Sequence, residues 1–184
     1  MSLLRTTSVH DALDGLVHAA RVAAVERDVP GAHARIVQAE RTFAAHRAQE
    51  ETHWLPLYTA RCVPHPNATP TVLLRDHALI ASLLAEAPTH GGLALVDLLE
   101  DLAGALEHHD QRERTHFKPA LDAVLTPAER TRLLELHAAS EQALDAPPSR
   151  VTTPWTPTPD APVQAVRAGL LAGQPLPDTL EHVL

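Results

Sequence analysis

The sequence predicts an all-α protein: an up-down-up-down four-helix bundle with an extra C-terminal helix and a proline-rich tail. Hydrophobic residues make up 45% of the chain but aromatic residues only 3%, and this composition, dominated by Ala and Leu, favours helices over sheets. Apolar residues recur at helical spacing through four long segments. These segments form two similar halves, because a His-x3-Glu-x2-His-x2-Pro pattern at residues 46–56 returns 63 residues later at 109–119.

The first half predicts two helices. One runs from Ser8, which can act as its N-cap, to about residue 26, and the breakers at 28–31 end it. The other runs from about residue 32 to 58 and carries the first copy of the pattern. Pro56 removes one hydrogen-bond donor and crowds the preceding turn, so we expect it to kink or finish this helix.

The second half repeats this layout after a breaker-rich loop. Thr69-Pro70 has the N-cap and N1 signature of a third helix, which stops at 88–92, and a fourth helix runs from about 93 to 124. His10 precedes His46 by 36 residues and His77 precedes His109 by 32. The difference is about one helical turn, so the faces stay in phase. Two helical hairpins packed together would give the four-helix bundle.

A capping box at 126–129 predicts a fifth helix that reaches about residue 144. The composition changes at about residue 146, and half of the 16 prolines lie beyond that point. This indicates an extended strap with one short helix at about 162–172. We therefore divide the chain into a bundle with its fifth helix at 1–145 and a tail at 146–184.

Bulk properties exclude several classes of function. A formal charge of −8 argues against a nucleic-acid partner. Cys62 is the single cysteine and cannot form an internal disulfide. No apolar run approaches the ~20 residues of a membrane span, and the N-terminus lacks a signal-peptide core. We expect a cytoplasmic protein that does not bind membranes; the sequence does not predict its oligomeric state.

The repeated pattern has the composition of a metal site. In a helix, residues at i, i+4 and i+7 share one face, so each copy aligns two imidazoles with a carboxylate between them. A single histidine on an apolar stripe is more often a core residue than a ligand. Duplication of the spacing favours ligation by His46, Glu50, His109 and Glu113, because so many inward polar groups would be costly to bury unpaired.

The order His, His-x3-Glu, His, His-x3-Glu over about residues 8–140 resembles the hemerythrin-like, or HHE cation-binding, family. The two motif segments also resemble that family's His-x3-Glu-Glu…Leu-Phe-Pro block, here as Glu50-Glu51…Trp54-Leu55-Pro56 and Glu113…Phe117-Lys118-Pro119. The resemblance implies a four-helix bundle that holds two non-haem irons, bridged by the two carboxylates and an oxo or hydroxo group. Carried over position by position, it implies six ligands: His10, His46, Glu50, His77, His109 and Glu113. His18, two turns after His10, competes with it.

Two features depart from the family pattern. Its oxygen carriers place a second His one turn from the position of His77, where this chain has Leu73 and Ala81. Instead, His53 and His116 extend each motif into Glu-x-x-His, the signature of ferritin-like carboxylate proteins. Two octahedral irons offer about twelve positions, so both extra imidazoles together would saturate the centre. We expect at least one to bind, which gives a predicted metal set of His10, His46, Glu50, His53, His77, His109, Glu113 and His116.

The favoured function is a non-haem di-iron protein that binds, senses or reduces a small oxidant such as O2, NO or peroxide. One alternative is an oxidase or ferroxidase of the Glu-x-x-His type. Another is a structural or sensory bundle that holds zinc, since imidazole and carboxylate suit Zn as well as Fe. The sequence leaves open whether the protein is an enzyme.

Overall fold

The structure, a computed structural model, describes Leu3 and residues 8–145 of the 184-residue chain, and this part is helical throughout with no strand. Its four long helices are α1 (Ser8–Val25), α2 (Val29–Gln49), α4 (Pro70–Glu86) and α5 (Gly92–Arg112), followed by α7 (Pro127–Asp145). The all-α class is thereby confirmed. The predicted tail at 146–184, with its short helix, lies outside the described residues, so the proposed domain division stays a prediction.

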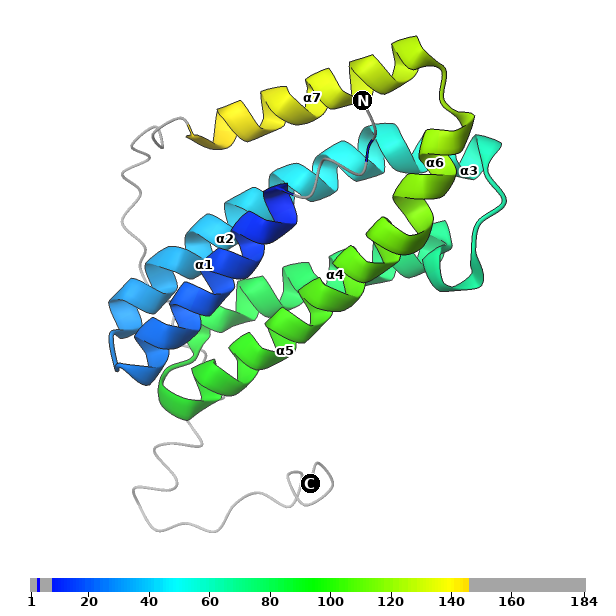
Figure 1. Ribbon diagram of the computed structural model, residues 1–184. Helices are drawn as coiled ribbons and strands as arrows, with labels where there is room; N and C mark the ends of the chain where they lie inside the picture. The colour runs from blue at the N-terminus through cyan, green and yellow to red at the C-terminus, as the bar shows by residue number, and fades with distance from the viewer. Residues whose placement is uncertain (1–2, 4–7, 146–184) are drawn as a thin grey trace, which may run out of the picture. The chain divides into compact units, whose positions relative to one another are not determined.

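The four long helices close into a ring of contacts. α1 packs on both α2 and α5, and α4 packs on the same two helices (Figure 1). α7 packs against α2. This arrangement is compatible with the expected four-helix bundle and its extra helix.

The capping groups explain where two helices begin. The Asp28 side chain accepts from the Gly31 backbone N–H at 2.9 Å, so the residues expected to form a break instead start α2 at Val29. At α7, Thr126 and Glu129 form the predicted reciprocal capping box. Within residues 8–145, no helix is both long and apolar enough to cross a bilayer.

The two motif-bearing helices each contain a π-helical turn. α2 continues through η2 (Glu50–Trp54) into α3 (Leu55–Arg61), and α5 continues through η5 (Glu113–Phe117) into α6 (Lys118–Val124). The backbone N–H of the residue after each turn donates to the carbonyl five residues back, from Leu55 to Glu50 and from Lys118 to Glu113. Such single π turns insert one extra residue into an α-helix and are frequent at functional sites.

A proline directly follows each of these bonds. Pro56 and Pro119 have no backbone N–H, and a proline ring in a regular helix collides with the carbonyl four residues earlier. The wider π turn moves that carbonyl away from the ring. The kink or helix end expected at Pro56 is therefore a local widening, and the helical path continues to Arg61.

The extra residue changes which side chains face inward after the motif glutamates. From His46, the buried positions advance in steps of four, and the same holds from His109. The buried sets are His46, Glu50, Trp54 and Tyr58 in the first half and His109, Glu113, Phe117 and Leu121 in the second. Positions 53 and 116, which an unbroken α-helix would place inward, are only half-buried.

A layer of buried polar groups separates two apolar cores. The larger core includes Val9, Phe43, Ile80 and Leu106, and the smaller one is built around Trp54, Tyr58, Leu73, Phe117 and Leu121. Along each long helix, a histidine lies at the edge of the larger core. The two cores fix the helices on either side of this layer. This packing holds the polar side chains of the layer in place.

Candidate metal centre

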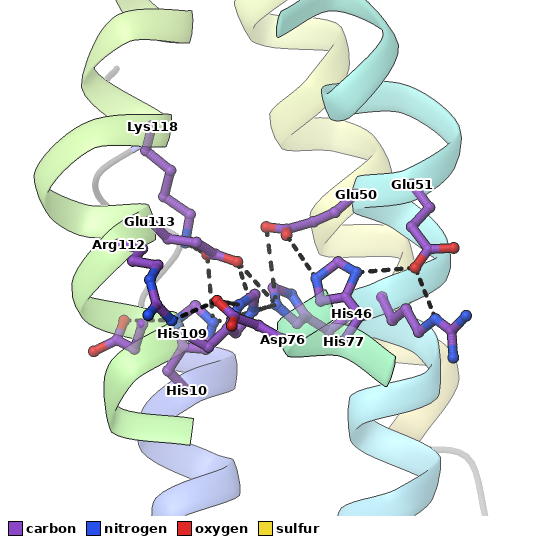
Figure 2. Close-up of polar contacts among 12 residues, drawn as sticks. His10, His46, Glu50, Glu51, Asp76, His77, His109, Arg112, Glu113 and Lys118 are labelled. Atoms are coloured by element: carbon purple, nitrogen blue, oxygen red, sulfur yellow. Dashed lines mark hydrogen bonds and ion pairs between the residues drawn. The ribbon is translucent and has the colours of Figure 1, made fainter. Parts of the chain in front are cut away.

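Five buried side chains converge in the layer between the two cores. Each offers one ligand atom, and these atoms all lie within 4.8 Å of one another. The contributing elements are α2 with η2, α4, and α5 with η5 (Figure 2). The five residues are His46, Glu50, His77, His109 and Glu113.

A sixth predicted residue, His10 of α1, contacts this cluster. Its Nε2 lies 3.2 Å from His46 Nε2 and 3.4 Å from Glu113 Oε2, and its side chain is buried. The competing His18 is exposed on the outer face of the same helix. The structure therefore places all six residues implied by the family resemblance in one buried group.

The atoms that face the middle of the group are those a cation would need. His109 Nε2 lies 2.7 Å from Glu113 Oε1, and His77 Nε2 lies 3.5 Å from Glu50 Oε2. Among the described residues, both carboxylate oxygens of each glutamate and Nε2 of His77 lack a hydrogen-bond partner of good geometry. Buried acceptors without donors are costly, and a metal ion would satisfy all of them. The donor set thus fits a metal rich in imidazole and carboxylate ligands.

The structure does not bring His53 or His116 into this group. Because of the π turns, the buried residues at this level are Trp54 and Phe117, one position after His53 and His116. Both histidines are half-buried. The His116 ring stacks on His65, with centroids 3.7 Å apart and planes 6° from parallel. The expectation that at least one of them is a ligand assumed an unbroken α-helix, and these helices are not unbroken.

Three of the four clustered histidines have a carboxylate beside their outward nitrogen. The Nδ1 atoms of His77 and His10 lie 2.9 Å from Glu51 Oε1 and 3.0 Å from Asp110 Oδ1. The third, His109 Nδ1, is 4.0 Å from Asp76 Oδ2. Carboxylates in this position fix the tautomer and ring orientation of metal-binding histidines and make them more basic.

An arginine anchors each of these three carboxylates. Arg47 Nε donates to Glu51 at 2.8 Å, Arg112 donates to Asp76 at 2.7 Å, and Arg114 forms an ion pair with Asp110. Burial would raise the pKa of Glu51 and of Asp110, but the arginine and histidine partners outweigh it and lower both pKa values. The lowered pKa values favour the ionised forms of Glu51 and Asp110, and Glu51 lies within hydrogen-bonding distance of His77 Nδ1.

Lys118 completes the site from the second half of the chain. Its side chain is only 1% exposed, its Nζ lies 2.9 Å from Glu113 Oε2, and it also lies over the Trp54 ring. Burial would lower the pKa of this ammonium, but Glu113 and then Glu50 raise it. A lysine is rarely buried to this extent without a partner or a function.

The two glutamates differ because of that lysine. Burial, and then the negative charge of Glu113, raise the pKa of Glu50 well above its ordinary value. Burial would do the same to Glu113, but Lys118 and the neighbouring imidazoles hold its pKa well below the ordinary value. Without a metal, these shifts favour the protonated form of Glu50 and the ionised form of Glu113.

Two of the clustered histidines, His46 and His77, can bind a metal without first losing a proton. Burial, opposed by Glu113, lowers the pKa of His46 to about 3. Burial and then His109 also lower the pKa of His77. Neutral imidazole is the form that binds metals, so protons do not compete with a cation at these two side chains near neutral pH.

Phe43 closes one side of the imidazole layer. Its ring approaches the rings of His77, His46 and His109 with centroids 5.9 to 6.4 Å apart. Glu50, Glu113 and Lys118 lie together on one side of the imidazole rings (Figure 2). The imidazole layer is thus in contact with both an aromatic ring and a charged group.

Sequence reasoning did not find Lys118 or Asp110 among the functional residues. Charged residues next to a motif are usually solvated, and the sequence alone assigns neither of them a role. A usable signal existed for Lys118: it aligns with Leu55 of the first half, inside the apolar run that follows each glutamate.

No protein-family model, curated protein or solved structure matches this chain. The chemistry of the buried group, together with the sequence pattern that encodes it, therefore carries the functional argument.

Proposed function

We propose that this protein is a non-haem di-iron protein of the hemerythrin-like type, with its four long helices forming an up-down-up-down bundle around the metals. The observation that carries the proposal is the buried group of four imidazoles and two carboxylates, in which Glu113 has one ion-pair partner outside the group, Lys118, and neither glutamate side chain has a hydrogen bond of good geometry among the described residues. The ligands would be His10, His46, Glu50, His77, His109 and Glu113.

The size of the donor set favours two metals over one. Six side chains would overfill one ordinary metal ion that must also bind a small ligand. Two carboxylates that can bridge, with two imidazoles for each metal, leave open positions on a pair of octahedral ions. When bound, two ferrous ions supply two electrons to a small oxidant such as O2, NO or peroxide.

The surrounding residues define how the chain would serve that chemistry. Glu51, Asp76 and Asp110 orient the imidazoles and keep Nε2 directed inward. Phe43 and the larger apolar core exclude water from one side, which strengthens electrostatic interactions inside. The alternative of a Glu-x-x-His oxidase receives no support from His53 and His116, which lie outside the buried group.

The proposal is tested by loading the full chain with ferrous iron without oxygen and then adding peroxide, O2 or NO. We expect a new visible absorption band for at least one of them, because an oxidised or ligated imidazole–carboxylate iron centre has charge-transfer transitions. A protein that holds its full iron and stays colourless with all three would contradict the proposal. A protein purified with zinc, and unstable without it, would support the structural alternative.

A further inference from the structure

Lys118 breaks the symmetry of the two halves. The corresponding residue of the first half is Leu55, which packs in the smaller apolar core. The Lys118 ammonium has three donors, and its one close carboxylate contact is Glu113 Oε2 at 2.9 Å. Among the described residues, Nζ has no hydrogen-bond partner of good geometry. An ammonium buried in this way retains donors for another acceptor.

The position of the ammonium relative to the ligands is equally specific. Lys118 and both glutamates lie on one side of the imidazole layer (Figure 2), and Phe43 packs against the imidazoles. The Lys118 ammonium therefore approaches the ligand atoms from the side of the two carboxylates, within reach of Glu113 Oε2.

The charge of the site favours an anion there. Two ferrous ions would bring four positive charges to a layer in which Glu50 and Glu113 supply two negative ones, and Lys118 adds a further positive charge. The three outer carboxylates do not offset this, because each is paired with an arginine. A buried site with such an excess of positive charge binds anions in preference to neutral molecules.

We propose that Lys118 is a ligand-positioning residue, and that its ammonium donates a hydrogen bond to a small anion bound at this centre. The inference rests on the di-iron function proposed above and deepens it by naming a residue that positions the ligand. Lys118 is then the residue that selects anionic ligands over neutral diatomic ones. A hydrogen bond from an ammonium to an anion is about twice as strong as one between neutral groups.

The first test compares the iron-loaded wild-type chain with Lys118→Met, which keeps the length of the side chain and removes its charge. Azide serves as the anionic probe and NO as the neutral one, and metal content is measured first. We expect the azide Kd to rise about tenfold or more in the variant, and the NO affinity to change less than about twofold. Unchanged azide binding, or equal losses for both probes, would overturn the inference.

A charge-swap variant provides the matched control. Leu55→Lys combined with Lys118→Leu moves the ammonium to the equivalent position of the first half and leaves the composition unchanged. We expect this double variant to regain azide affinity to within about threefold of wild type, because the anion needs the charge and not the particular helix. Azide binding as weak as in Lys118→Met would contradict a role for the charge itself.

A measurement on the wild-type protein covers the case in which these variants do not fold. The vibrational spectrum of bound azide is recorded in H2O and in D2O. A shift between the solvents is expected because an exchangeable N–H donates to the azide, and its absence would overturn the inference. A wild-type chain that binds no iron would instead refute the proposed function, so the two failures are distinguishable.

Discussion

The two motif-bearing segments share a backbone design but differ in charge. In residues 46–58 and 109–121, a histidine, a glutamate and an aromatic residue follow one another in steps of four, with a π turn between and a proline just after it. Arg47 and Glu51 form an ion pair in the first segment. At the equivalent positions of the second, the signs are exchanged, with Asp110 paired to Arg114.

This exchange shows how one repeat can serve two different partners. In the first segment the carboxylate is Glu51, which directly follows the motif glutamate and reaches His77 of α4. In the second it is Asp110, which directly follows the motif histidine and reaches His10 of α1. Each motif helix therefore orients a histidine on a neighbouring helix. The second difference is Leu55 against Lys118, and the pKa of Glu50 is raised while that of Glu113, beside Lys118, is lowered. The shared backbone builds the site, and the differing charges make its two sides unequal.

The largest expected effect comes from removing one carboxylate at a time in the metal-free protein. Glu113→Gln leaves the Lys118 ammonium buried without its anion, which should cost about 3–5 kcal/mol of unfolding free energy. Glu50→Gln should cost less, because burial and the charge of Glu113 already favour the neutral form of Glu50. Urea unfolding with a chelator present measures both. Equal losses would mean that the two halves are electrostatically equivalent.

The next effect concerns the orienting carboxylates. Glu51→Gln and Asp110→Asn should each weaken metal binding about 10- to 100-fold, because the partner histidine loses a fixed acceptor. Asp76→Asn should weaken it less, since Asp76 lies 4.0 Å from its histidine. Competition with a chelator of known affinity gives the order. A larger loss for Asp76→Asn than for the other two would show that these contacts do not orient the ligands.

The unequal glutamates also predict the pH dependence of metal binding. The raised pKa of Glu50 favours its protonated form in the metal-free protein, so metal binding should release a proton and the metal affinity should fall as the pH falls through that raised pKa. His46, with a pKa of about 3, adds no proton release near neutral pH. Calorimetry in buffers of different ionisation enthalpy counts the protons, and about one is expected. Glu50→Gln should abolish the release, whereas proton release unaltered in that variant would assign it to another group.

The smallest effect is expected at the histidines that the π turns rotate away from the site. His53→Ala and His116→Ala should leave metal affinity within about threefold of wild type, because neither side chain belongs to the buried group. Chelator competition again provides the measurement. A loss comparable to that of His46→Ala would show that these residues bind the metal.

Much of this molecule could be predicted from the sequence. Apolar periodicity and capping residues located the long helices to within about three residues, since packing and caps are local signals. The six residues implied by the family resemblance lie together because the helices are regular α-helices up to each motif glutamate. The extra residue of each π turn changes the direction in which every later side chain points. That is why His10 and Glu50 were placed well and His53 was not.

The missed features had weak sequence signals. Trp54 and Tyr58 stand at steps of four from His46, and this competes with the inward placement of His53. A proline soon after each motif suggested a break, although a π turn also accommodates a proline ring. Asp110 and Lys118 were not among the predicted site residues, because charge alone does not reveal burial. Their roles depend on contacts between helices, which periodicity within a single helix cannot specify.

Counting the metals bound per chain tests the central claim most directly. The wild-type protein, His53→Ala and His46→Ala would be loaded with ferrous iron under the same conditions, desalted and measured by elemental analysis. The account predicts about two irons per chain in wild type and His53→Ala, and a clear loss in His46→Ala. The reason is that His46 belongs to the buried group and His53 does not. A wild-type chain that retains no metal, or an equal loss in both variants, would contradict it.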